Sequence, residues 1–276
     1  MKYAIAVRPD YPRAAAAASA AAARMRARGD DVVEVQLDSP TLAADVAGAQ
    51  VACVFGGDGT MLRAARAFAP LGLALLGVNM GRLGFLTTTP SEQLDAVIAE
   101  VSQGRYSCED RSLVHARLRR DGREVVHVNA LNDVVVARGQ LVRSIHIEVR
   151  IDDAPFTVYW ADGLVVATAT GSTAYGFSVG GPIILPHSDA VMIVPIAPHL
   201  SFRNAVVLEG DQRIDLRILD EPARLSLDGQ EEHDLHVGDV IDVRRSATVA
   251  RFVRTAGMRP FLELLRTKIL KEDGGL

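Results

Sequence analysis

Short apolar runs alternate with stretches of helical spacing over the first hundred residues. The apolar runs predict strands at residues 3–7, 32–35, 51–55 and 73–78. Helices are predicted over 14–28, 61–68 and 90–103. The last of these has apolar residues at helical spacing and Ser91 placed as its cap. Strands that alternate with helices indicate a parallel, doubly wound sheet, so we expect a Rossmann-like α/β domain.

The pattern changes near residue 105, where short runs rich in Val, Ile and Leu follow one another, separated by Gly, Asp, Asn and Pro. They predict strands at 113–118, 125–128, 133–136, 145–151, 156–160, 164–167, 191–196, 206–208, 213–218, 224–227 and 240–244. Many short strands with turn residues between them indicate a β-sandwich. Residues 260–271 again have helical spacing, with Phe261, Leu264, Leu265 and Ile269 on one face. We therefore expect an α/β domain over 1–105, joined by 259–276, and a β-sandwich domain over 106–258.

Composition narrows the class of protein. The chain has 276 residues, of which 49% are apolar and 23% charged, as is usual for a soluble globular protein. The net charge of −4 argues against a general nucleic-acid binder, which normally carries a basic surface. The alanine-rich run at 14–23 is shorter than a membrane span and predicts a soluble helix, and the apolar N-terminus is too short for a signal peptide. These features predict a cytoplasmic protein without membrane partners.

The cysteines and histidines do not form a metal-binding pattern. Cys53 and Cys108 are the two cysteines, and neither belongs to a CxxC motif. We expect two reduced, half-buried thiols, and the position of Cys53 within an apolar strand suits a small core residue. The histidines at 187, 199, 233 and 236 lack the spacing of a metal site and are expected on surfaces or loops.

A glycine-rich loop, Gly56-Gly57-Asp58-Gly59-Thr60, follows the predicted strand at 51–55 directly. Glycines allow a sharp bend and a close approach of a ligand to the main chain, and the N-terminus of a following helix favours phosphate. A carboxylate beside a phosphate is unfavourable unless it meets a metal ion or a hydroxyl group. Asp58 could therefore hold Mg²⁺ or accept the proton of an attacking hydroxyl. The alternative is a tight turn with a surface aspartate, since the loop matches neither the Walker nor the G-x-G-x-x-G motif.

The predicted β-domain carries two further motifs. The apolar run at 163–167 ends in the small and hydroxyl-bearing residues Thr168-Ala169-Thr170-Gly171-Ser172-Thr173-Ala174-Tyr175. Small residues leave room for a flat ring, and hydroxyls can bind a ribose. Asn132-Asp133, just before another strand, offers donors and acceptors for an adenine edge and a ribose. Ordinary turns would explain both segments equally well.

In this order, the motifs resemble those of the bacterial NAD kinase family, over nearly the whole chain. The resemblance rests on the loop at 56–60, the segment 77–86, Asn132-Asp133, Asp162-Gly163, the segment 170–175, Gly180-Gly181-Pro182 and Asp228-Gly229. The glycine loop alone is shared with lipid kinases and phosphofructokinases. The segment at 170–175 with Gly-Gly-Pro downstream is much more specific.

The resemblance implies transfer of a phosphoryl group from ATP or polyphosphate to the 2′-hydroxyl of the adenosine ribose of NAD, giving NADP. Asp58 is then the general base, and Mg²⁺ is carried on the nucleotide rather than by a protein metal site. The residues implied to bind NAD are Asp58, Gly59, Asn132, Asp133, Asp162, Thr173, Ala174 and Ser178. Those implied to hold the phosphate donor are Gly56, Gly57, Gly59 and Thr60. Family members are homodimers or homotetramers, and Asp162 matches a residue that in some of them reaches NAD across a subunit interface.

Two positions depart from the family pattern. Asp133 stands where the family usually has glutamate, so its side chain is one methylene shorter. Ala169 replaces a proline and removes its fixed φ. Arg63, Arg66 and Arg82 lie near the glycine loop in sequence and could steer phosphates, but a solvated helix face is the safer interpretation of Arg63 and Arg66. Two other functions remain open: a lipid kinase of the diacylglycerol or sphingosine type, and a catalytically silent NAD-binding module.

Overall fold

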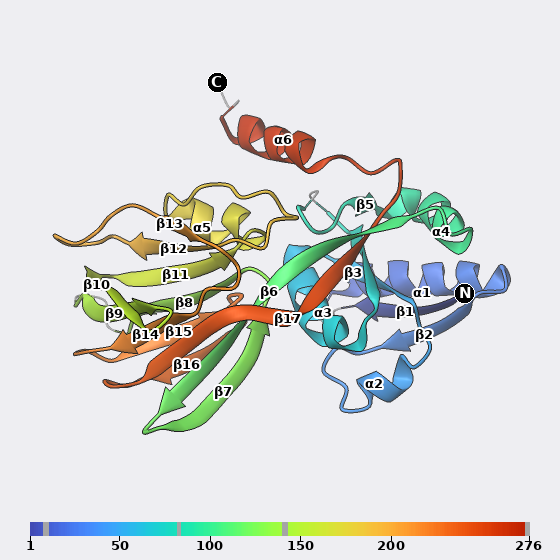
Figure 1. Cartoon of the computed structure of the whole chain (residues 1–276). Coiled ribbons are helices and arrows are strands. Elements are labelled where there is room, and N and C mark those ends of the chain that lie inside the picture. Colours follow the sequence, from blue (N-terminus) through green and yellow to red (C-terminus); the bar gives the residue numbers. More distant parts are fainter. Residues whose placement is uncertain (8–10, 82–83, 140–142, 274–276) are drawn as a thin grey trace. The chain divides into compact units, whose positions relative to one another are not determined.

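The computed structural model describes residues 1–7, 11–81, 84–139 and 143–273, the last five by their backbone alone. The chain divides into two compact units (Figure 1). Unit 1 comprises Met1–Asp110 with Ala250–Leu276, and unit 2 comprises Arg111–Val249. Two long strands, β6 (Ser107–Arg120) and β17 (Val240–Arg254), run from one unit into the other.

Unit 1 is built on a parallel sheet. Its strands are β1 (Lys2–Val7), β2 (Asp31–Val35), β3 (Val51–Gly56), β4 (Ala74–Asn79) and the short β5 (Thr89–Pro90). The order is β17-β4-β3-β1-β2, and β5 pairs with β4. All of these pairs are parallel. Because β3 and β4 are buried at every position, their continuous apolar runs are those of a sheet covered on both faces.

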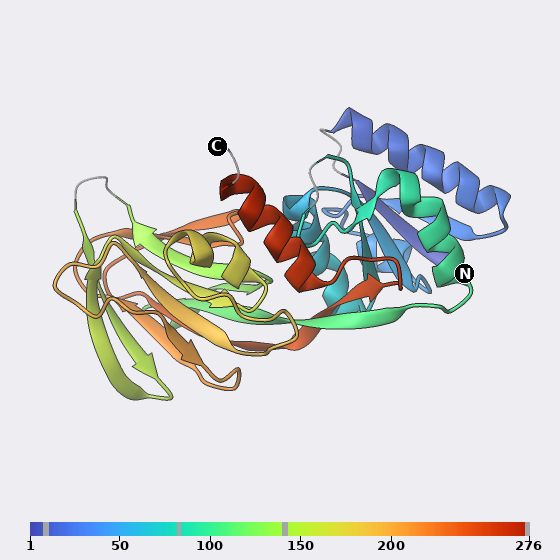
Figure 2. The same cartoon turned by 90° about the horizontal axis from the view of Figure 1, so that it is seen from above.

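Unit 1 also contains helices. They are α1 (Pro12–Ala27), α2 (Leu42–Asp45), α3 (Asp58–Phe68), α4 (Leu94–Ser102) and α6 (Phe261–Asp273), with the 3₁₀ turns η1 (Ala69–Leu71) and η2 (Ser91–Gln93). Helices α1 and α4 pack into one apolar cluster with one face of the sheet, and Figure 2 shows them side by side. The small residues of α1, among them Ala14, Ala18 and Ala22, let that helix lie close to the strands. A salt bridge of 2.9 Å between Arg24 Nε and Asp95 Oδ2 links the two helices at the surface.

Unit 2 is a sandwich of two antiparallel sheets. One has the order β10-β9-β14-β17, and β6 joins β17 to β7. Its strands besides β6 and β17 are β7 (Arg123–Ala130), β9 (Ile145–Ile151), β10 (Ala154–Ala161) and β14 (Ile214–Ile218). The other sheet has the order β13-β12-β11-β8-β15-β16. Its strands are β8 (Asp133–Arg138), β11 (Gly163–Thr168), β12 (Val191–Ile196), β13 (Val206–Leu208), β15 (Ala223–Leu227) and β16 (Glu231–Leu235).

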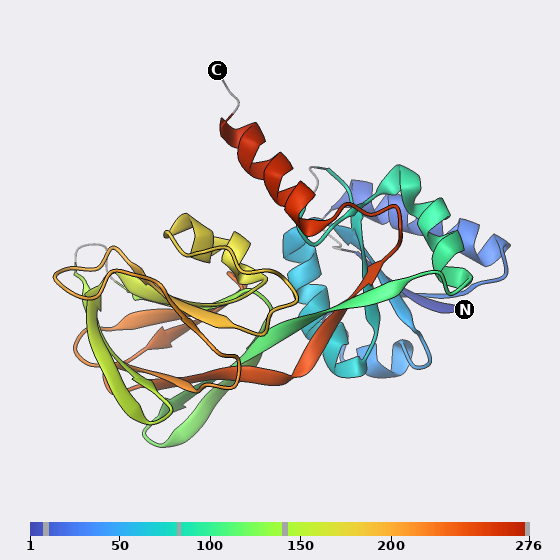
Figure 3. The same cartoon turned by 45° about the horizontal axis from the view of Figure 1, so that its top comes forward.

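The alternation of side chains along β8 shows how the second sheet is filled on both faces. Val134 and Val136 point into the core that the two sheets share. Val135 points to the opposite face, where it packs with Val165 and Met192. The turn η3 (Gly171–Thr173) and the helix α5 (Tyr175–Ser178) contact β11, and Figure 3 shows α5 over this sheet. The segment that sequence analysis singled out therefore lies against a buried strand.

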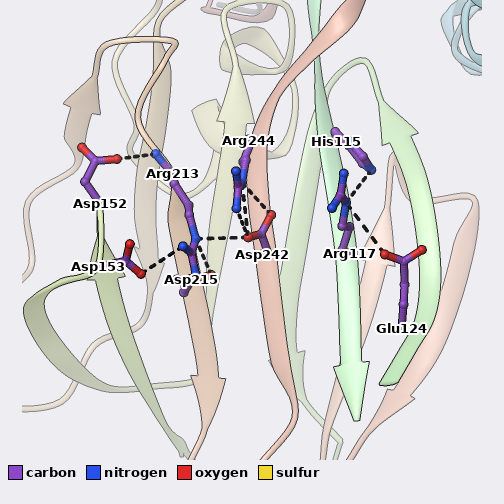
Figure 4. A network of polar contacts seen from close by, with 9 residues as sticks. All are labelled: His115, Arg117, Glu124, Asp152, Asp153, Arg213, Asp215, Asp242 and Arg244. Atoms are coloured by element: carbon purple, nitrogen blue, oxygen red, sulfur yellow. Dashed lines mark hydrogen bonds and ion pairs between the residues drawn. The ribbon is translucent and has the colours of Figure 1, made fainter. Parts of the chain in front are cut away.

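The other sheet of unit 2 carries an ionic network on its outward face (Figure 4). Asp215 of β14 and Asp242 of β17 are cross-strand partners and are both buried. Arg213 joins them, with 2.6 Å from Nη2 to Asp215 Oδ2 and 3.1 Å from Nε to Asp242 Oδ2. Arg244 adds a second contact to Asp242, at 2.9 Å. Two like charges directly opposite each other in a sheet repel, so the arginines are what makes this pair tolerable.

The fold class predicted from sequence is confirmed, and the final helix lies in unit 1, where the rings of Phe261 and Phe85 are 6.0 Å apart. Several details were wrong. Helix α3 begins at Asp58 rather than Met61, and Ser91 begins a 3₁₀ turn, with its hydroxyl directed to Glu92 instead of capping a helix. β5 and β16 were not predicted. The face predicted for the last helix is only partly buried, since Leu264 is buried, Phe261 and Leu265 are half-buried and the Ile269 side chain lies outside the described residues.

The two cysteines lie in different environments. Cys53 is buried in β3, as suits a small core residue, and Cys108 is exposed, so neither thiol is half-buried as expected; both are free. Within the described ranges, no helix combines the length and the apolar character that crossing a membrane requires.

Candidate functional site

The glycine loop lies at the topological switch point of the unit 1 sheet. β1 has β2 on one side and β3 on the other, so the chain leaves β1 toward one edge and later continues from β3 toward the opposite edge. In open α/β sheets, ligands bind outside the carboxyl ends of the strands at such a point. Gly56 ends β3 and Gly57 precedes α3, which places the loop in that position.

The loop forms the N-terminus of α3. Gly57 is the N-cap residue in extended conformation, and Asp58 and Gly59 belong to the first turn, where the helix dipole favours negative ligands. A Cβ on Gly57 or Gly59 would meet nothing within 4 Å, so the surface above these residues is open. The Thr60 side chain, in contrast, is buried and packs against Gly56, where a Cβ would collide with Thr60 Oγ1. The buried Thr60 side chain therefore packs against the bend of the loop and stabilises it.

The Asp58 carboxylate is held by the turn formed by residues 84–87. Its Oδ1 accepts hydrogen bonds of 3.1 Å from the backbone N–H groups of Leu86 and Thr87 and from the Thr87 hydroxyl. Its Oδ2 accepts one bond of 2.8 Å, from the Phe85 N–H. Asp58 is thus a fixed carboxylate rather than a mobile surface group. Arg82, which sequence analysis placed near this loop, lies outside the described residues.

In unit 2, the ends of β8 and β11 bring together residues predicted to bind NAD. Asp133 pairs with Ala167, and the Thr168 N–H donates to Asn132 O at 2.9 Å. The Thr168 hydroxyl donates to Leu131 O at 2.6 Å and accepts from the Gly171 N–H at 3.1 Å. The Asn132-Asp133 turn therefore lies directly against the start of the Thr170 to Tyr175 segment.

Gly171 is where these two segments touch. A Cβ at this position would collide with the backbone of Asn132, including its carbonyl oxygen. After Gly171, Thr173 and Ala174 are half-buried and Ser178 is exposed. The hydroxyls of Thr173 and Ser178 donate back to Thr170 O and Ala174 O. The segment forms a 3₁₀ turn followed by a short helix, where the alternative interpretation had a Thr/Ser-rich β-turn.

Asp228 fixes the other side of this turn, and its part was not predicted beyond the family motif. Its Oδ1 accepts from the N–H groups of Asn132 at 2.7 Å and Asp133 at 3.2 Å, and its Oδ2 accepts from the Leu131 N–H at 3.0 Å. Asp228 has a φ of +53°, which is uncommon for a residue with a side chain and keeps the carboxylate aimed at three consecutive amides. The signal in the sequence was an aspartate followed by glycine directly after an apolar strand.

The Asp133 carboxyl, unlike that of Asp228, is buried without a hydrogen-bond donor in the described part of the chain. It is 4% exposed, and its side chain accepts no hydrogen bond from the described residues. Burial raises the pKa of this carboxyl from the ordinary 3.8 to about 7, and the charge of Asp228 adds to the effect. A carboxyl group with such a pKa is partly protonated at neutral pH and can then donate a hydrogen bond.

Asp162 does not lie with these residues. It precedes β11, whereas Asn132 and Asp133 lie beside the opposite end of that strand. Six residues of extended chain separate Asp162 from Thr168, about 20 Å. Its Oδ1 is 3.0 Å from Arg138 Nη1 and accepts a bond of 3.3 Å from the Ser144 hydroxyl. Within one copy of the chain, Asp162 belongs to a separate polar cluster.

A protein-borne metal cage is not found in the part of the chain that the structure describes, where no three His, Cys, Asp or Glu side chains gather as a metal site would require. Of the histidines, His233 contacts Glu231 at 2.9 Å and the ring of His199 lies 5.4 Å from that of Trp160. Neither contact has the character of a metal site.

Family models and curated relatives both match most of this chain. Residues 7–106 match the ATP-NAD kinase N-terminal domain, and residues 131–255 match the ATP-NAD kinase C-terminal domain. The chain is 37% identical to an NAD kinase of Symbiobacterium thermophilum, over 97% of this chain and 98% of the relative. It is 40% identical to an NAD kinase of Acidobacterium capsulatum, over 80% and 78% of the two chains.

Two solved structures share the fold. A yeast NADH kinase complexed with NADH has a TM-score of 0.82 and 26% identity, covering 93% of this chain and 84% of that one. An NAD kinase from Archaeoglobus fulgidus in complex with ATP has a TM-score of 0.76 and 24% identity, covering 93% and 94%. The second likeness, at this identity, concerns the fold alone.

Proposed function

This chain belongs to the NAD kinase family, and we propose that it transfers the terminal phosphoryl group of ATP to the 2′-hydroxyl of the adenosine ribose of NAD, giving NADP and ADP. The observation that carries the proposal is the fixed Asp58 carboxylate in the first turn of α3, at the switch point of the sheet. Phosphoryl transfer needs positioning and charge stabilisation more than covalent chemistry, and both are available there.

In this proposal, Gly56, Gly57 and Gly59 hold the donor phosphates through backbone N–H groups at the start of α3. The open surface above Gly57 and Gly59 supports this role. The buried Thr60 side chain supports a structural part for that residue, beneath the loop. Mg²⁺ enters as the complex with ATP. Asp58 is the one carboxylate of the loop, and the protein donors around it favour a hydrogen-bonding role over metal ligation.

Asp58 acts as the general base. The 2′-oxygen attacks the terminal phosphorus as its proton passes to Asp58, the bond to the bridging oxygen breaks, and ADP leaves with that oxygen. A ribose hydroxyl is a very weak acid, so this proton moves late, as the transition state forms. General-base assistance of this kind contributes typically ~10²- to 10⁴-fold to the rate.

Unit 2 supplies the contacts to NAD in this proposal. Asn132 and Asp133 face the adenosine, and Thr173, Ala174 and Ser178 line its pocket. The support is local geometry: Gly171 lets the two segments touch, and Asp228 fixes the turn that carries Asn132 and Asp133. The Asp133 side chain is one methylene shorter than the usual glutamate, so it reaches less far toward the ligand. Because burial raises the pKa of its carboxyl to about 7, that group is partly protonated at neutral pH.

We propose that the active enzyme is a homodimer or homotetramer. The position of Asp162 supports this, because about 20 Å of strand separates it from the Asn132-Asp133 turn within one copy. In this proposal, the Asp162 that contacts an NAD molecule comes from a second copy.

The test is an assay for NADP with the full chain, NAD, Mg²⁺ and either ATP or polyphosphate. We expect NADP to form, and Asp58→Asn to lower kcat at least about a hundredfold while NAD still binds, as measured by calorimetry. Asp38→Asn, at an exposed position of unit 1, is the matched control for the lost charge. Phosphorylation of a lipid without NADP would indicate the lipid kinase instead. Tight NAD binding without turnover would indicate a silent module, and near-normal turnover of Asp58→Asn would remove Asp58 from the base role.

A further inference from the structure

The hydrogen bonds to Asp58 are distributed unequally between its two oxygens. Oδ1 accepts hydrogen bonds from two backbone N–H groups and the Thr87 hydroxyl, whereas Oδ2, among the described residues, accepts one from the Phe85 N–H alone. A carboxylate oxygen offers two lone-pair directions, so Oδ1 is fully engaged by the protein. Oδ2 retains a lone pair. If Asp58 is a base, Oδ2 is the oxygen that takes the proton.

We propose that Thr87 is a positioning residue for the phosphoryl transfer, whose hydroxyl holds Asp58 Oδ1 so that Oδ2 faces the attacking 2′-hydroxyl. This inference rests on the proposed function and names a residue that neither the glycine loop nor the NAD pocket contains. Thr87 is fully buried and makes no contact with substrate in this scheme. It acts through Asp58.

Asn79 sets the direction of the Thr87 hydroxyl. The Gly81 N–H donates to Asn79 Oδ1 at 2.6 Å, so the amide oxygen must face Gly81. The Asn79 Nδ2 group therefore faces Thr87, where it donates to the carbonyl oxygen at 3.3 Å and to the hydroxyl oxygen at 3.4 Å. Because Nδ2 is only a donor, the Thr87 hydroxyl accepts from it and has its own proton left for Asp58. The chain of hydrogen bonds runs in one direction, from Asn79 through Thr87 to Asp58.

Gly84 shows how closely the turn fits the carboxylate. The Gly84 N–H donates to Thr87 O at 3.4 Å, which closes the turn. A Cβ on Gly84 would collide with both Asp58 Oδ1 and Thr87 Oγ1. The turn therefore approaches Asp58 as closely as a bare backbone allows, and Oδ1 has no room to rotate toward Gly84.

Loss of the Thr87 hydroxyl should loosen Asp58 without releasing it, because two N–H groups remain on Oδ1. A misplaced catalytic group costs rate rather than substrate affinity. We expect Thr87→Val to lower kcat about tenfold, the effect of one hydrogen bond to a charged group, with KM for NAD and ATP within about twofold. Thr87→Ser keeps the hydroxyl and should retain most of the rate.

The experiment is a double-mutant cycle of Thr87→Val and Asp58→Asn in the full chain, with kcat, both KM values and the urea midpoint measured for each protein. If Thr87 acts through Asp58, the tenfold effect of Thr87→Val shrinks to less than about twofold in the Asp58→Asn background. Thr89→Val is the matched control, since Thr89 is a buried threonine two residues away whose hydroxyl has no partner among the described residues. It should leave kcat unchanged.

Three outcomes would overturn the proposal: full kcat in Thr87→Val, an equal loss of kcat in both backgrounds, or a rise in KM without a fall in kcat. If Thr87→Val does not fold, Thr87→Ser and Thr87→Ala decide, because both lack the methyl group and only the serine keeps the hydroxyl. Equal kcat in those two variants would then reject the role. A wild-type chain that forms no NADP rejects the proposed function and the Thr87 role together, whereas active wild type with active Thr87→Val rejects the Thr87 role alone.

Discussion

Asp133 makes the stability of unit 2 depend on pH in an unusual direction. Burial, and then the charge of Asp228, raise the pKa of this carboxyl from 3.8 to about 7. Between these two values the folded chain holds a proton that the unfolded chain has lost. Stability from this group therefore falls as pH rises from about 4 to about 7, because the proton-richer state is the folded one. The usual aspartate, whose pKa is depressed on folding, behaves in the opposite way.

The magnitude follows from the two pKa values. At 1.36 kcal/mol for each pH unit, the difference between 3.8 and about 7 corresponds to about 4 kcal/mol of destabilisation above pH 8. The Asp133 side chain is almost fully buried, so solvent screening reduces this figure little, although local relaxation does. Asp133→Asn keeps the shape and cannot ionise. We expect it to stabilise the chain by roughly 2 to 4 kcal/mol at pH 8.5 and by less than about 1 kcal/mol at pH 4.5.

The assay is urea unfolding followed by tryptophan fluorescence. Trp160 is the one tryptophan of the chain and lies in β10, so its emission reports on unit 2. Wild type, Asp133→Asn and Asp211→Asn are compared from pH 4.5 to 8.5 at constant ionic strength, and the exposed Asp211 controls for net charge. If Asp133→Asn stabilises the chain equally at every pH, or more at pH 4.5 than at 8.5, then burial does not raise the pKa of the Asp133 carboxyl.

Two further substitutions test other parts of unit 2. Gly171→Ala places a Cβ against the Asn132 backbone and should raise the KM for NAD about tenfold, with less effect on kcat, since it disturbs proposed binding contacts; steady-state kinetics with NAD varied would show this. An unchanged KM would remove the Gly171 contact from the binding site. Arg213→Ala leaves the buried Asp215 without its ion pair and weakens the neutralisation of Asp242, so it should lower the free energy of unfolding by roughly 2 to 4 kcal/mol. The same fluorescence assay measures that loss, and a loss of less than about 0.5 kcal/mol would mean that the network does not stabilise the sheet.

The apolar pattern predicted most strands because each of them contributes apolar side chains to a buried core. The bounds of β9, β12 and β13 agree with the prediction at both ends. β16 was missed because its first four residues, Glu231 to Asp234, are charged or polar, and Leu235 alone is fully buried. It is the edge strand of its sheet, where pairing with β15 on one side is enough to hold polar residues in extended form.

The candidate site was predictable where it is local and not where it depends on tertiary contacts. The glycine loop can be predicted from five consecutive residues, because tight turns need glycine. The hydrogen bonds that fix Asp58 come from residues 27 to 29 positions further along. The N–H groups that donate to Asp228 lie 95 to 97 positions earlier, in the turn that leads into β8. No local pattern encodes such contacts, so neither Thr87 nor the clamping by Asp228 could be derived from the residues alone.

Four aspartates of the site have the same side chain in the sequence and four different environments in the structure. Asp58 accepts four hydrogen bonds, Asp228 accepts three, and Asp162 meets Arg138 and Ser144. Asp133 accepts none from the described residues and has a pKa of about 7. The donors around a carboxylate decide whether it is held as an anion or can carry a proton. Asp133 is therefore the aspartate suited to donate a hydrogen bond to a ligand. Asp58 is held as an anion by its four donors, and in the proposed mechanism the remaining lone pair of Oδ2 accepts the hydrogen bond of the attacking 2′-hydroxyl.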